Sequence, residues 1–326
     1  MVDPLTIELI EDTITEDVSG RGVIKYLVNA LHDKYGYVLG DAVELIRSSV
    51  SKGSYVLVIT GFRPPPTYAQ ETDGPLGAAA LARVLSMGLQ AKVLVLIDSF
   101  RDSVDAMEVA LDSLGIDYVV NCLLLSNYLN FNVCIEVLPK NELLLKLTIY
   151  ELIDLEPTLA IYVERVGPNY LGVMHSMKGI NVSNYHSSIN ELHNCLVRNG
   201  VPTIGIGDGG NEVGMGVIED AVRKYVPFGN RCLCPCMGGI ACSLRTDVLI
   251  ASAVSNWGAY ALVALLAKYL RRFELVMKPH EEVVGLRNLA ISGVVDGVLG
   301  TRGPSVDSIP AEVSAEVVSG ICRLIR

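Results

Sequence analysis

Short apolar runs alternate with longer helical patterns along most of this chain, and this alternation limits the possible folds more than any other feature. The runs are rich in Val, Ile and Leu and are almost uninterrupted by polar residues, as expected for strands buried on both faces of a parallel sheet. The predicted strands are residues 55–61, 91–99, 117–122, 159–165, 202–208 and 247–254, with a weaker candidate at 131–138.

The segments between these strands have helical periodicity. The predicted helices are residues 76–89, 103–114, 141–152, 187–198, 211–225 and 256–270. Repeated strand–helix units predict an α/β fold, namely a three-layer, doubly wound, mostly parallel sheet with helices on both faces. We expect residues 1–50 to form an N-terminal helical segment packed on the main domain, and residues 51–326 to form one continuous α/β catalytic domain.

Composition excludes some classes of function. The net charge of -10 argues against nucleic-acid binding, which needs clustered Lys and Arg. The mean hydropathy is high, at +0.40, but the longest apolar runs are shorter than the roughly 20 residues that span a bilayer. The acidic N-terminus resembles neither a secretory signal nor a transit peptide. We therefore expect a cytoplasmic protein with a small-molecule substrate, no membrane partner and, given its apolar composition, possible self-association into a homo-oligomer.

The eight cysteines fall into two groups. Those in or beside apolar runs are predicted to be small core residues, and they are Cys122, Cys134, Cys195 and Cys322. The second group is Cys232, Cys234 and Cys236 in CLCPC, with Cys242 six residues further on. These cysteines could bind a metal, although their spacing differs from the C-x₂-C pairs of common zinc sites. A disulfide is an equal alternative if the source is a hyperthermophile, so the sequence does not assign this group a role.

Polar or glycine-rich residues follow five of the predicted strands, including GFRPPPTYAQETDGP, VGPN, DGGNE and SNWG. In doubly wound sheets, ligands bind beyond the carboxyl ends of the strands. We therefore expect these strand ends to form one pocket.

The segment GIGDGGNEVGMG (residues 205–216) contains G-x-G-x-x-G, yet it does not fit a nucleotide-binding loop. It lies two-thirds along the chain, lacks G-K-[ST], and places Asp208 where a pyrophosphate would sit. The segment instead predicts a turn whose backbone amides at Gly207, Gly209 and Gly210 bind a substrate carboxylate at the start of a helix. Asp208 and Glu212 would be acid and base groups, and the alternative is that Asp208 only caps the helix.

ETDGP places Glu71 and Asp73 two residues apart before a predicted helix, so these carboxylates are suited either to binding a hard divalent cation or to capping that helix. Lys178 in SMKGIN is either an exposed lysine or one that binds a carboxylate. The five histidines form no zinc-binding pattern; His175 lies near a strand end, and the others are predicted to lie at the surface.

The chain contains several motifs in an order that resembles the D-glutamate cyclase family. The resemblance is specifically to the C-terminal domain of the mitochondrial enzyme, which also exists as a stand-alone prokaryotic form. The motifs are DVSGRG, ETDGP, IYVERVGPNY, GIGDGGNEVGMG, SNWGAYAL and GVVDGVLGTRGPSVDSIP, which together span nearly the whole chain. The segment VERVGPNY departs from the longer ERAGR-type stretch of the family, and CLCPC is not a family feature.

The resemblance implies a hydro-lyase that cyclises D-glutamate to 5-oxo-D-proline with loss of water. On this hypothesis Asp208 and Glu212 divide the acid and base roles, and Glu71 with Asp73 binds either the substrate ammonium or a divalent ion. No cofactor is certain, but Mn²⁺ or Mg²⁺ is a candidate, with Glu71, Asp73 and Asp208 as its ligands. The remaining expected substrate-binding residues are Asn211, Asn256, Arg165 and Lys178. The alternatives are a racemase or hydrolase acting on a small amino or hydroxy acid, and a non-catalytic small-molecule binding protein.

Overall fold

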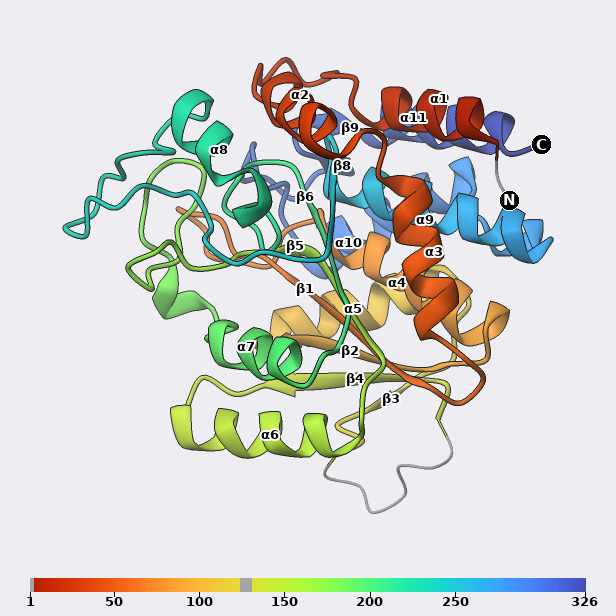
Figure 1. Cartoon of the computed structure of the whole chain (residues 1–326), viewed down its shortest axis with the longest axis horizontal. Coiled ribbons are helices and arrows are strands. Elements are labelled where there is room, and N and C mark those ends of the chain that lie inside the picture. The colour runs from red at the N-terminus through yellow and green to blue at the C-terminus, as the bar shows by residue number, and fades with distance from the viewer. Residues whose placement is uncertain (1–2, 124–130) are drawn as a thin grey trace.

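The computed structural model describes residues 3–123 and 131–326. Within these residues, seven parallel strands form one sheet in the order β3-β4-β2-β1-β5-β6-β7 (Figure 1). The strands are β1 (Tyr55–Gly61), β2 (Lys92–Asp98), β3 (Val119–Val120), β4 (Val133–Leu138), β5 (Leu159–Arg165), β6 (Thr203–Gly207) and β7 (Val248–Ala251). All seven predicted strands are confirmed, although β3 and β7 are shorter than expected.

The strand order reverses between β1 and β5. From β1 the chain passes to β2, then to β3 at the edge, and then to β4, which lies between β3 and β2. It then returns to the centre and moves the other way from β5 to β7. Such a reversal leaves a crevice at the carboxyl ends of the two central strands. The polar segments that follow β1 and β5 therefore begin at the edge of this crevice.

Helices cover both faces of the sheet, which confirms the three-layer, doubly wound fold. They are α1 (Pro4–Ile14), α2 (Ile24–Tyr35), α3 (Leu39–Ser49), α4 (Pro75–Arg83), α5 (Arg101–Ser113), α6 (Glu142–Asp154), α7 (Asn190–Arg198), α8 (Glu219–Tyr225), α9 (Ser255–Leu270), α10 (Pro279–Ser292) and α11 (Ala311–Leu324). In Figure 1, α6 and α7 lie side by side, and α4, α9 and α10 are grouped apart from them. A short antiparallel pair, β8 (Ser305–Val306) and β9 (Ile309–Pro310), precedes α11.

One helix prediction is wrong at its start. The helix expected at 211–225 begins only at Glu219, after a single 3₁₀ turn at Gly216–Ile218. The glycine-rich segment before it is an irregular turn instead, with Gly210 and Gly214 at φ of 102° and 107°, which is the left-handed region that glycine tolerates. No helix dipole therefore starts at Asn211.

Most of the apolar interior is one cluster, and Phe62, Val166, Met174 and Val182 form a second, smaller one. The main cluster of buried hydrophobic residues runs from Ile10 in α1 to Ile325 after α11, and it includes the apolar faces of α2 and α3. The sixteen-residue helix α9 is buried from Ser255 to Ala267, and all nine residues of α4 are buried. Among the described residues, no helix is both long and apolar enough to cross a bilayer.

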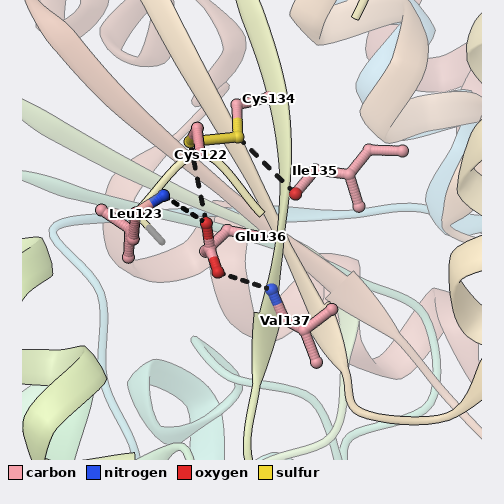
Figure 2. The surroundings of a disulfide bond; sticks show 6 residues. All are labelled: Cys122, Leu123, Cys134, Ile135, Glu136 and Val137. Atoms are coloured by element: carbon pink, nitrogen blue, oxygen red, sulfur yellow. Dashed lines mark hydrogen bonds between the residues drawn. A yellow bond between two sulfur atoms is a disulfide. The ribbon is translucent and has the colours of Figure 1, made fainter. Parts of the chain in front are cut away.

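Cys122 and Cys134 are not simple core residues as expected, because they form a disulfide (Figure 2). The bond joins Cys122, two residues after the end of β3, to Cys134 in the neighbouring strand β4. Both cysteines are buried. Glu136 lies beside it and accepts a hydrogen bond from the Leu123 amide at 3.0 Å (Figure 2). The sequence pattern indicates only that both cysteines are buried. It could not reveal this pairing, because free and disulfide-bonded cysteines fit an apolar run equally well.

Candidate functional site

A cavity of about 260 Å³ lies at the carboxyl edge of the sheet, where the strand order reverses. This volume is slightly below the range of roughly 300–1,000 Å³ that is typical of small-molecule sites. Its polar and charged lining residues are Arg21, Glu71, Glu164, Ser176, Lys178, Asp208, Asn211, Glu212 and Asp307. Five carboxyl groups from distant parts of the sequence thus face one small space, as the strand-end pattern predicts for Glu71, Asp208 and Glu212.

Glu71 reaches the cavity because the loop after β1 is held against the loop before β8. The Thr72 amide donates to Val295 O at 2.9 Å, and the Val295 amide donates to Gln70 O at 3.0 Å. Gly297 faces the Glu71 carboxylate so closely that a Cβ at this position would collide with it. Among the described residues, Glu71 Oε1 has no hydrogen-bond partner although it is buried. This oxygen is therefore available to a ligand.

Asp73 lies behind Glu71 and caps a helix, but not the helix that follows it. Its carboxylate accepts hydrogen bonds from the Ser255 and Asn256 amides at 2.8 and 2.7 Å, at the start of α9. Asn256 in turn accepts from the Gly74 and Gly77 amides at the start of α4. Asn256 thus does not line the cavity, and its amide group fixes the Glu71–Asp73 loop rather than binding a ligand.

The turn after β6 does not form the anion cradle that its glycines suggest. The Gly209 and Gly210 amides donate to the side chain of Glu212 itself, at 3.0 and 2.8 Å. Gly207 lies in β6, and a Cβ there would be 3.0 Å from Glu212. The expectation that these amides bind a substrate carboxylate is therefore wrong, because an internal carboxylate already occupies the amides of Gly209 and Gly210.

Asp208 does not cap a helix either. Its carboxylate accepts a hydrogen bond from Arg21 Nη2 at 2.7 Å, and the same guanidinium lies 3.4 Å from Asp307 Oδ2. Arg21 is further held by the carbonyl oxygen of Ala253. Arg21 and Asp307 come from opposite ends of the chain, and sequence reasoning missed both of them. Arg21 lies in DVSGRG and Asp307 in GVVDGVLGTRGPSVDSIP, and these family motifs are the sequence signal that could have identified both residues.

Glu164 is another cavity residue that the sequence analysis does not predict, whereas it does predict the neighbouring Arg165. The pairing of β1 with β5 shifts register at this point, and Glu164 adopts a left-handed φ of 44°. A non-glycine residue with this φ is strained, and such strain concentrates at functional sites. Glu164 lines the cavity, and it accepts a hydrogen bond from Ser255 Oγ at 2.6 Å.

Arg165 is directed into the protein interior instead. Its guanidinium makes two hydrogen bonds of 2.8 Å to the two oxygens of Asp98 and a third to Ser187 O. His186 Nδ1 lies 2.7 Å from the same Asp98 carboxylate, and all three side chains are buried. Arg165 is therefore a structural residue here and does not line the cavity. His186 and His193 are both buried, contrary to their predicted surface positions.

Lys178 and Asn211 line the cavity as expected. Lys178 is exposed and sits at the rim, whereas Asn211 is buried. Asn211 Nδ2 donates to His175 O at 3.0 Å, and its Oδ1 has no hydrogen-bond partner among the described residues. The cavity thus offers one cation at its mouth and one free amide oxygen inside.

Crowding and burial favour the protonated forms of these carboxyl groups. Burial, followed by the charge of Asp208, raises the pKa of Glu212 to about 8 and that of Asp73 to about 7. Burial together with the neighbouring carboxylates raises the pKa of Glu71 and of Glu164 well above the usual range. Several of these groups can therefore donate protons near neutral pH, a behaviour that is concentrated at functional sites.

The same oxygens also suit a divalent cation. Two overlapping sets have ligand atoms within 4.8 Å of one another, namely Asp73, Asp208 and Asp307, and Glu164, Asp208 and Glu212. Carboxylate oxygens are the ligands that Mg²⁺ and Mn²⁺ prefer. Because Arg21 already bridges Asp208 and Asp307, the second set is the better fit for an ion. Among the described residues, Glu71 belongs to neither set.

The fold and the cavity together define a doubly wound α/β protein with an acidic small-molecule site at the reversal of its strand order. The chain belongs to the family described as D-glutamate cyclase-like, C-terminal, whose model matches residues 10–322. It is also similar to "D-glutamate cyclase, mitochondrial" from Homo sapiens, with 27% identity over 300 residues. That alignment covers 82% of this chain but 45% of the human protein, so the chain spans less than half the length of this relative.

Proposed function

We propose that this protein cyclises D-glutamate to 5-oxo-D-proline with release of water. The observation that carries the proposal is the convergence of five carboxyl groups, Arg21 and Lys178 on a cavity of about 260 Å³ in a chain of this family. A substrate with one ammonium and two carboxylate groups has complementary partners in such a site. The name of the human relative supports the choice of substrate.

The reaction forms a bond between the amine nitrogen and the δ-carbon, breaks a carbon–oxygen bond there, and moves protons from nitrogen to the departing water. The amine must lose a proton to become nucleophilic. α-Amino groups have a pKa of about 8 and therefore keep that proton at neutral pH. We assign the removal of this proton to Asp208. The ion pair with Arg21 holds the Asp208 carboxylate at the cavity as a proton acceptor.

Glu212 is suited to the opposite role. Its pKa of about 8 keeps the carboxyl group protonated at neutral pH, so it can donate a proton to the oxygen that leaves. The free oxygens of Glu71 and Asn211 are acceptors for the substrate ammonium, and Lys178 at the rim is a partner for a substrate carboxylate. As an alternative to the Glu212 proton, a Mn²⁺ or Mg²⁺ ion held by Glu164, Asp208 and Glu212 as carboxylates would polarise a substrate carboxyl group when bound.

The test is to incubate the purified protein separately with D-glutamate, L-glutamate and 5-oxoproline, each with and without Mn²⁺ or Mg²⁺. Chiral chromatography then follows every product. We expect 5-oxo-D-proline to form from D-glutamate faster than any product forms from L-glutamate. An Asp208→Asn preparation purified in parallel controls for contaminating enzymes.

Three results would contradict the proposal. Interconversion of D- and L-glutamate without ring closure would indicate a racemase. Ring opening of 5-oxoproline with no detectable closure of either enantiomer would indicate a hydrolase. Thermal stabilisation by glutamate with no product under any metal condition would indicate a binding protein.

A further inference from the structure

A second group of potential ligands lies outside the acidic site, in the CLCPC segment that the reaction does not use. The three sulfur atoms of Cys232, Cys234 and Cys236 are 3.3–3.5 Å apart. His175 Nε2 lies 3.2 Å from the Cys234 sulfur and 3.5 Å from the Cys236 sulfur. Three sulfur atoms and one imidazole nitrogen from two separate segments thus surround one point.

From these distances we propose that His175, Cys232, Cys234 and Cys236 bind one zinc ion as a structural Cys₃His site. A tetrahedral centre with Zn–S bonds of about 2.3 Å and a Zn–N bond of about 2.0 Å has S–S edges of about 3.8 Å and N–S edges of about 3.5 Å. The observed separations are within about half an ångström of these edges, so only a small outward movement is needed on binding.

The orientation of the loop is the opposite of what hydrophobic packing alone would produce. Leu233 and Met237 are 67% and 44% exposed, whereas Cys232 is buried and Cys234 and Cys236 are partly buried. A loop driven by apolar burial would turn its leucine inward. Here the three thiols point inward instead, toward a fully buried histidine.

The surroundings provide the support that metal ligands need. Asn169 Nδ2 lies 3.7 Å from the Cys236 sulfur and also donates to Gly239 O at 2.8 Å, so it can stabilise a thiolate. The Leu233 amide donates to Gly179 O at 2.9 Å and joins the cysteine loop to the segment that carries His175. Both segments are therefore positioned without the ion.

Other chemistry of three cysteines fits less well. Sulfur atoms in a disulfide are about 2.05 Å apart, and none of these pairs is that close. An iron–sulfur cluster contains several metal atoms, so its cysteine ligands stand further apart than those of a single ion, and Cys₄ is its usual ligand set. A single tetrahedral ion matches both the number and the spacing of the ligands.

The site also has a place in the architecture. His175 immediately precedes Ser176, Met177 and Lys178, which line the acidic cavity, and its carbonyl oxygen fixes Asn211. A zinc ion would therefore clamp one wall of the cavity to the 232–236 loop. It lies outside the carboxylate sets, so its role is structural and does not depend on the proposed reaction.

Elemental analysis of the protein purified under reducing conditions with Zn²⁺ present tests the proposal. We expect about one zinc per chain, which resists dialysis, and a clear loss of zinc from Cys234→Ser. Cys195→Ser, which alters a free cysteine in α7, is the matched control and should retain the parent's zinc content. Absence of stoichiometric zinc from the parent, or iron with acid-labile sulfide in its place, would overturn the proposal.

Two further measurements keep the test independent of variant folding. Replacement of zinc by Co²⁺ in the parent should give the intense visible bands of tetrahedral thiolate coordination, and weak octahedral bands would refute it. Thiol titration of the denatured, metal-free and unreduced parent should detect the six cysteines outside the Cys122–Cys134 disulfide. A count of four would mean a disulfide within the cluster and would exclude the site. Neither measurement depends on turnover of glutamate.

Discussion

Asp73 and Asn256 cap each other's helices. Asp73 Oδ1 accepts a hydrogen bond from the Asn256 amide at 2.7 Å, and Asn256 Oδ1 accepts from the Gly74 and Gly77 amides at 3.0 and 2.7 Å. The ends of α4 and α9 are thereby locked together directly behind the acidic cavity. This arrangement explains why a polar pair lies in one of the most buried parts of the protein.

Removal of this cap should destabilise the fold. Asn256→Ala leaves the buried Gly77 amide without an acceptor and leaves the Gly74 amide with Asp73 Oδ1 alone. We expect the free energy of unfolding to fall by about 1–3 kcal/mol. Urea unfolding followed by circular dichroism measures the change. Asn29→Ala, at an exposed position in α2, is the control and should change stability by less than about 0.5 kcal/mol. Equal stability of the two variants would refute the capping role.

Glu212→Gln and Asp208→Asn should each lower the turnover of D-glutamate by roughly 10² or more, because each removes a proton-transfer group from the proposed reaction. Steady-state assays under the best metal condition measure the loss, and thermal melts confirm that the variants fold. Glu219→Gln changes a glutamate in α8 outside the cavity, so its turnover should match the parent's. Parent-like turnover in both cavity variants would remove Asp208 and Glu212 from the mechanism.

Stability should fall as the pH rises above neutrality. The raised pKa of Glu212, about 8, means that the folded protein retains a proton that the unfolded chain loses near pH 4. The folded state binds more protons between these values, so the free energy of unfolding decreases with pH by up to about 1.4 kcal/mol per unit for one such group. The decrease ends once the pH exceeds the folded pKa.

Urea unfolding at several pH values between about 6.5 and 8.5, without added divalent ions, measures this slope. The window begins at the usual pKa of histidine, about 6.5, so the buried histidines contribute mainly at its lower end. Glu212→Gln should show a shallower slope than the parent. Identical slopes would mean that the Glu212 carboxyl group is already ionised in the folded protein.

Arg165→Met tests whether Arg165 is structural. The substitution leaves Asp98 buried without its guanidinium partner, and we expect a loss of about 3–5 kcal/mol in the free energy of unfolding. Asp98→Asn in the same chain removes the stranded charge and should restore part of that loss, which a double-mutant cycle measures. An increase in KM at unchanged stability would instead place Arg165 at the substrate.

Most of the sheet could be predicted from the sequence because its strands are buried on both faces. The apolar run that forms β2, for example, has its only buried carboxylate at the end, Asp98. The turn at 208–215 was harder to predict, since G-x-G-x-x-G and a following helical pattern also fit an anion-binding loop. Only the position of the Glu212 side chain shows that the amides are already occupied.

The candidate site could be predicted only where its residues directly follow strands. Glu71, Asp208 and Glu212 have that property, and all three line the cavity. Arg21 and Asp307 do not follow strands of the central sheet, so their approach depends on how the terminal segments pack. The choice between Glu164 and Arg165 depended on a shift in strand register, which alternation of residue types does not encode.

The contact of Arg21 with Asp208 and Asp307 also sets a limit on when the protein can work. During synthesis Arg21 leaves the ribosome long before Asp307 is added. A nascent chain can fold much of its sheet, yet its cavity remains open on the side that Asp307 closes. Chemistry that requires this enclosure therefore begins only after Asp307 has been added and has packed against Arg21.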